Sequence, residues 1–183
     1  MSTQAIIESG MTFGPYPAGQ CFYIEKSKCY SQIQEGVKMV EFLLLMPQKK
    51  SQTMWVIEAK SSSPRPENQP NFSAFIEEVR TKLTNGFLLA VAALLQRHQT
   101  AVNELSAAFK AFDLKTQNFR FVLVINGHEP ASLEALQNAL TKALKPLVKT
   151  WALPPCSVAV LNHVSALKYG LILPAVGTDH EHP

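Results

Sequence analysis

The sequence has few cysteines and no long hydrophobic run. Its three cysteines, Cys21, Cys29 and Cys156, are odd in number and far apart, and no C-x-x-C pair indicates a zinc or redox centre. We therefore expect reduced, partly buried thiols. The longest apolar stretch, residues 87–95, is less than half of the about 20 residues that a helix needs to cross a bilayer. A disulfide-stapled protein and a membrane-spanning protein are both disfavoured.

Several common catalytic signatures are also missing. The chain contains no nucleophile elbow, no P-loop and no G-x-G-x-x-G turn, so hydrolases, nucleotide kinases and dehydrogenases of those types have no support. The N-terminus lacks the basic start, apolar middle and cleavage site of a secretory signal. A cytoplasmic location is the resulting expectation.

Neither sign of charge dominates the chain. The formal net charge is +3 at pH 7 and 17% of the residues are charged, which permits an anionic partner without identifying one. With 183 residues, 46% of them hydrophobic, the chain is long enough for one core and short for two. We expect a single domain over residues 1–183, with a core at about 21–165, an N-terminal loop segment at 1–20 and a flexible C-terminal tail at 175–183.

What the sequence does contain is an alternation of β-rich and helical segments. Strands are predicted at residues 21–27, 37–46, 53–60, 118–126 and 156–164, and helices at about 28–36, 71–98, 102–112 and 133–149. Asn85-Gly86 is expected to weaken the long helix midway, and Pro146 to end or kink the last one. The order of segments predicts an α/β fold in which helices cover both faces of a mixed sheet.

The segment from residue 40 to residue 60 carries ionisable groups on strands that otherwise look buried. Side chains alternate along a strand, so Glu58 and Lys60 share a face, and a short hairpin brings Glu41 to within a few ångströms of Glu58. Like charges across a strand pair repel, and burying them unpaired is unfavourable. A divalent cation would stabilise them, and Mg²⁺ commonly uses only one or two protein carboxylates.

This pattern resembles the PD-(D/E)xK nuclease superfamily, also called restriction-endonuclease-like. Glu41 stands at the position of the acidic residue on the first strand of the hairpin. Glu58-Ala59-Lys60 stands at the E-x-K that ends the second strand, 17 residues later. A helix and a further strand follow, and the resemblance covers about residues 21–161. The chain departs from the pattern at Glu41, where the family usually has aspartate.

The resemblance implies a restriction-endonuclease-like fold and hydrolysis of a phosphodiester in DNA or RNA with Mg²⁺ or Mn²⁺ as cofactor. Glu41, Glu58 and the Ala59 carbonyl would hold the metal, and Lys60 would orient or help to deprotonate the attacking water. Glu25, expected at the end of the first strand, is the candidate for an additional acidic ligand.

Two other interpretations are open. A catalytically inactive relative with the same fold would serve as a nucleic-acid-binding or complex-assembly subunit. An unrelated α/β interaction protein would carry Glu58 and Lys60 as a surface ion pair. Arg80 and Lys82, with Lys49 and Lys50, would either guide a phosphate backbone or form a solvated face. A homodimer and a subunit of a larger complex are both compatible with the sequence.

Overall fold

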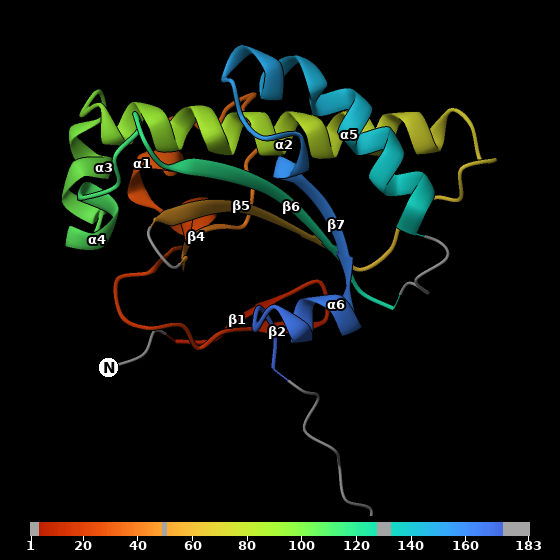
Figure 1. Ribbon diagram of the computed structural model, residues 1–183, viewed down its shortest axis with the longest axis horizontal. Helices are drawn as coiled ribbons and strands as arrows, with labels where there is room; N and C mark the ends of the chain where they lie inside the picture. The colour runs from red at the N-terminus through yellow and green to blue at the C-terminus, as the bar shows by residue number, and fades with distance from the viewer. Residues whose placement is uncertain (1–3, 49–50, 128–132, 174–183) are drawn as a thin grey trace, which may run out of the picture.

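A five-stranded mixed sheet forms the centre of the protein (Figure 1). The computed structural model describes residues 4–48, 51–127 and 133–173. The strand order is β3-β4-β5-β6-β7, where β3, β4 and β5 are antiparallel neighbours and β5, β6 and β7 are parallel. The bounds are Cys21–Phe22 for β3, Phe42–Pro47 for β4, Gln52–Lys60 for β5, Asn118–Ile125 for β6 and Val158–Asn162 for β7. The mixed α/β sheet expected from the sequence is confirmed.

The two faces of the sheet are covered differently (Figure 1). The long helices α2 (Asn71–Leu94) and α5 (Leu133–Thr150) cover one face, beside the short helices α1 (Lys28–Ser31), α3 (Gln99–Glu104) and α4 (Ala107–Lys110). On the other face lie the hairpin of β1 (Ile6–Glu8) and β2 (Met11–Phe13) and the helix α6 (His163–Lys168). Each face buries its own hydrophobic cluster, so the strands are apolar on both sides, as interior strands require.

The N-terminal segment forms a hairpin where a loop was predicted. Ile6 pairs with Phe13, and the turn between the strands uses positive φ angles at Ser9 and Gly10. Phe13 is fully buried against the sheet, and it also bridges to Ile172 near the C-terminal end of the described chain. Each strand has only three residues and is flanked by Gly or Pro, which the sequence pattern indicates as loop. The predicted tail at 175–183 lies outside the described residues.

The first two strands of the central sheet are shorter than predicted. β3 ends at Phe22 and is followed by a 3₁₀ helix, η1 (Ile24–Lys26), so Glu25 lies in a helical turn and not at the end of a strand. The segment predicted as a strand from residue 37 enters the ladder only at Phe42. The Glu41 amide still donates to the Ile57 carbonyl, and the Glu41 carbonyl accepts from the Glu25 amide. These two bonds hold Glu41 between η1 and β5.

Neither of the two positions expected to disturb a helix ends it. α2 continues through Asn85-Gly86, because Gly86 is where the helix packs most closely on the chain that precedes β4. A Cβ at this position would lie 2.5 Å from Val40 Cγ2. α5 continues through Pro146 to Thr150, and the exposed position of Pro146 leaves water to satisfy the carbonyl that loses its donor.

Candidate metal and catalytic site

The charged groups of the hairpin meet at the C-terminal end of β5, on the side of the sheet that α2 covers. Glu58 shares this face with Met54 and Val56, which pack in the α2 cluster. The register that pairs Phe42 with Ile57 places Glu41 beside Glu58. Glu58 is 0% exposed and Glu41 is 6% exposed. The two carboxylates are therefore neighbours and are both buried, which was the expectation from strand alternation.

Two lysines contact the Glu58 carboxylate. Lys82 Nζ lies 2.8 Å from Glu58 Oε1 and 3.8 Å from Glu41 Oε1. Lys60 Nζ lies 3.4 Å from the same Glu58 oxygen and 2.7 Å from Glu78 Oε1, and Lys38 Nζ is 3.9 Å from the other Glu78 oxygen. Glu58 is thus held between two ammonium groups.

Lys82 belongs to the site, although the sequence pattern suggested only a phosphate contact or a solvated position for it. Its side chain is only 15% exposed, so the expected solvated face is wrong for this residue. The signal was present in the helical period: Lys82 follows the buried Val79 by three residues and precedes the buried Gly86 by four, which places it on the buried face of α2. Arg80, by contrast, is partly exposed and pairs with Glu77 on the same helix.

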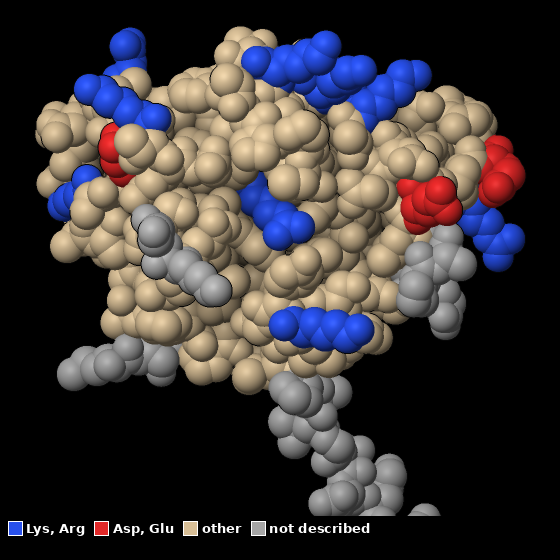
Figure 2. Space-filling model, in the orientation of Figure 1, with Lys and Arg blue, Asp and Glu red and all other residues tan. Residues whose placement is uncertain are grey.

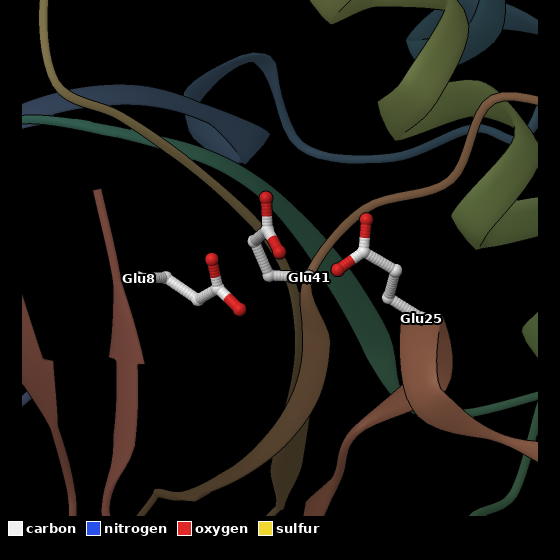
Figure 3. A group of neighbouring side chains, drawn as sticks. All are labelled: Glu8, Glu25 and Glu41. Carbon is white, nitrogen blue, oxygen red and sulfur yellow. The ribbon is translucent and has the colours of Figure 1, made fainter.

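A second group of acidic side chains adjoins Glu41. One carboxylate oxygen from each of Glu8, Glu25 and Glu41 lies within 4.8 Å of the other two. Figure 3 shows the Glu41 carboxylate between those of Glu8 and Glu25, each from a different part of the chain. The Tyr23 hydroxyl donates a hydrogen bond to Glu8 Oε1. Glu25 was expected near the site, whereas Glu8 was missed because its place depends on how the hairpin docks.

Burial sets the protonation of these groups. Burial, the Glu58 charge and contact with Glu25 together raise the pKa of Glu41 to about 8, and the nearby Lys82 opposes them only in part. Burial also raises the pKa of Glu58, against the opposing effect of Lys82 and Lys60. For Lys82, burial favours the neutral form, but the Glu58 and Glu41 charges outweigh it, so the pKa of Lys82 is raised.

The carboxylates are not fully satisfied by the residues around them. Neither Glu41 Oε2 nor Glu58 Oε2 has a hydrogen-bond donor among the residues that the structure describes. Buried oxygens of this kind are costly unless a cation or donor reaches them. Ala59, the third predicted metal ligand of the E-x-K triplet, lies beside Val124 in the β5–β6 ladder, and its side chain packs in the cluster on the opposite face.

Basic side chains gather elsewhere on the surface, over α5 on the face shown in Figure 2. Lys142, Lys145 and Lys149 line a cleft of about 510 Å³ together with Val148 and Leu153. Lys49 and Lys50, considered for phosphate contacts, lie outside the described residues. An anionic partner would find more cationic side chains at α5 than at the buried corner of Lys60 and Lys82.

The chain matches no protein-family model, no curated protein and no solved structure. No relative therefore tests the resemblance to PD-(D/E)xK nucleases, which stays a prediction from Glu41 and the Glu58-Ala59-Lys60 triplet. Among the described helices, none combines the length and the apolar character that a bilayer crossing requires.

Proposed function

We propose that the protein is a divalent-metal-dependent phosphodiesterase acting on DNA or RNA, built on a restriction-endonuclease-like fold. The observation that carries this proposal is the convergence of Glu41, Glu58 and Lys60 at the end of β5, where Glu41 is buried and incompletely neutralised. A buried, under-neutralised carboxylate beside an ammonium group is suited to a divalent cation and an anionic substrate.

The topology supports the same proposal. An antiparallel hairpin, β4–β5, carries the acidic residue and the E-x-K triplet, and a helix, α2, leads to the parallel strand β6. This is the order that the resemblance implies. Fold alone does not establish activity, so the argument for catalysis rests on the side chains at the hairpin.

The exposures of the site residues separate their roles. Glu58 is fully enclosed, whereas the Lys60 side chain is 25% exposed and is the group of the pair that substrate or water can reach. Glu58 and Glu78 hold the Lys60 ammonium from two sides, where it would orient the attacking water and stabilise negative charge on the phosphate. Glu41 would bind the metal, which supplies Lewis-acid activation when present.

A non-catalytic role as a nucleic-acid-binding or assembly subunit is the second candidate. The observation that favours it is the position of Lys82, whose Nζ contacts Glu58 and lies close to Glu41. An ammonium group there already supplies positive charge between the two carboxylates. In this case the fold and the exposed lysines of α5 would be used for binding only.

Cleavage assays test the proposal. Wild-type protein is expected to cleave single- or double-stranded DNA or RNA with Mg²⁺ or Mn²⁺ and to lose this activity in EDTA. Glu41→Gln and Lys60→Ala should each lower the rate by about 100-fold or more, the scale of a lost general acid–base or electrostatic group. Glu35→Gln, at an exposed acidic position, is the matched control and should cleave like the wild type.

The two candidates give different results in the same assays. Binding of nucleic acid without cleavage in either metal, measured by fluorescence anisotropy, would favour the non-catalytic subunit. Wild-type rates in both Glu41→Gln and Lys60→Ala would show that any observed cleavage comes from another site or from a contaminant.

A further inference from the structure

The geometry points to a carboxylate triad, Glu8, Glu25 and Glu41, as the seat of the divalent cation, with the N-terminal hairpin supplying one ligand. This inference rests on the proposed metal-dependent function and goes beyond the Glu41–Glu58 pair that the sequence indicated. It assigns a binding role to Glu8 and a structural role to Lys82 at the same site.

The triad has dimensions that a cation can bridge. Its three oxygens lie within 4.8 Å of one another. Two ligands of one ion are at most twice the metal–oxygen distance apart, which is about 4.6–5.2 Å for Ca²⁺ and about 4 Å for Mg²⁺. The 4.8 Å limit lies within the two-ligand range for Ca²⁺ and above the value for Mg²⁺, so the triad shown in Figure 3 is nearer to the size that Ca²⁺ requires. Mg²⁺ would draw the carboxylates closer, leaving its other positions to water and substrate.

A second observation, separate from the grouping of acids, also indicates a cation. Glu41 is 6% exposed, and its Oε2 has no hydrogen-bond donor among the described residues. The nearest ammonium group, that of Lys82, is 3.8 Å from the other oxygen, Oε1. Glu41 therefore presents a buried, unpartnered oxygen, which a cation held with Glu8 and Glu25 would satisfy.

Lys82 explains why the cation is not expected between Glu41 and Glu58. Its Nζ is 2.8 Å from Glu58 and 3.8 Å from Glu41, so an ammonium group already stands by both carboxylates. A metal ion there would have to displace it. The balance of charge agrees with one divalent ion when Glu41 is ionised, as it would be as a metal ligand. The carboxylates of Glu8, Glu25, Glu41, Glu58 and Glu78 then exceed the ammonium groups of Lys38, Lys60 and Lys82 by two negative charges.

The position of Glu8 is held by contacts on both sides. The Tyr23 hydroxyl donates to its carboxylate, and the Asn126 amide at the end of β6 donates to the Ser9 carbonyl at 3.1 Å. The hairpin turn is thereby attached to the same end of the sheet as Glu58 and Lys60. Glu8 and Glu25 are each partly exposed, so an ion can reach the triad from solvent.

Metal binding is measured directly, without the activity assay. Mn²⁺ is titrated into the full-length protein and followed by electron paramagnetic resonance and calorimetry. Wild type is expected to bind one ion, and Glu8→Gln and Glu25→Gln should each weaken the affinity by about 10-fold or more, because each removes one charged ligand. Glu35→Gln, at an exposed site outside the triad, should bind like the wild type.

The ion itself is located by anomalous scattering from crystals grown with Mn²⁺. A peak among Glu8, Glu25 and Glu41 supports the triad, and this result does not depend on whether any variant folds. A peak between Glu41 and Glu58, or wild-type affinity in Glu8→Gln, overturns the triad and leaves the proposed nuclease intact. A wild type that binds no ion overturns both. Binding at the triad without cleavage of any nucleic acid leaves the triad and rejects the nuclease.

Discussion

The acidic groups on the two sides of Glu41 differ in how the chain balances their charge. On one side, Glu58 is fully enclosed and lies within 3.4 Å of two ammonium groups, those of Lys60 and Lys82. On the other side, Glu8 and Glu25 are partly exposed, and carboxylate faces carboxylate. The chain supplies its own cations where solvent cannot reach. The side left unneutralised is the one that an ion from solvent can enter.

The largest expected effect is the loss of the internal cation in Lys82→Met. Methionine keeps most of the length and the apolar contacts of the side chain, but Glu58 would retain only the more distant Lys60. Leaving a buried charge without its main partner costs about 3–5 kcal/mol. The measurement is the free energy of unfolding from urea denaturation at neutral pH, in the presence of EDTA.

Two further variants test whether that loss of stability comes from the unpaired Glu58 charge. Lys142→Met, in the cleft on α5 where Lys142 is exposed, should change stability by no more than about 0.5 kcal/mol. Glu58→Gln combined with Lys82→Met should recover much of the loss, because the unpaired charge is then absent. A single variant as stable as the wild type would mean that Lys82 does not balance Glu58.

The contrast also shows what the sequence could predict. The sequence predicts that Glu41, Glu58 and Lys60 lie close together, and the β4–β5 register and the Lys60–Glu58 contact agree with this. The prediction was possible because strand alternation and hairpin register are local properties. Glu8 could not be placed in this way, because it reaches Glu41 only when the N-terminal hairpin docks against the sheet. Tertiary packing of this kind has no signal in local periodicity.

Errors in the fold prediction had similar causes. Gly86 was interpreted by its low helix propensity, whereas its role is to let α2 approach Val40. Glu25 was assigned to a strand because the preceding residues are β-rich, yet the chain leaves the ladder after Phe22 and turns into η1. The burial of Lys82, by contrast, does follow from local spacing, because its distance from Val79 places it on the buried face of the helix.

Glu41→Gln is expected to have an intermediate effect on the free energy of unfolding when no metal is present. Glu41 has no ammonium group as close to it as Lys82 is to Glu58. The folded state raises the pKa of Glu41 from 4.5 to about 8, so it binds this proton more tightly than the unfolded chain does. The corresponding stability is complete below the unfolded pKa and is lost as pH rises through about 8. Glutamine resembles the protonated acid. At about pH 9 the variant should therefore be more stable than the wild type by at least about 2 kcal/mol.

The pH dependence is the deciding feature of that comparison. Thermal or urea unfolding in EDTA should give nearly equal stabilities at about pH 4, below the unfolded pKa, where Glu41 is protonated in both the folded and the unfolded wild type, and should separate the two proteins as pH rises. A difference that stayed constant across this range would indicate a packing change at position 41 and not relief of its charge.

The smallest effect is expected for an ion pair on the exposed side of the same helix. Arg80 Nε donates to Glu77 Oε2 at 2.7 Å, a contact as short as those around Glu58. The Arg80 and Glu77 side chains are nevertheless 34% and 60% exposed, so water solvates both charges when the pair is broken. Arg80→Ala should lower the free energy of unfolding by no more than about 0.5 kcal/mol. Urea denaturation of Arg80→Ala and Lys82→Met under the same conditions compares the two losses in the free energy of unfolding. Equal losses would mean that distance alone, and not enclosure, decides what these lysine and arginine contacts contribute.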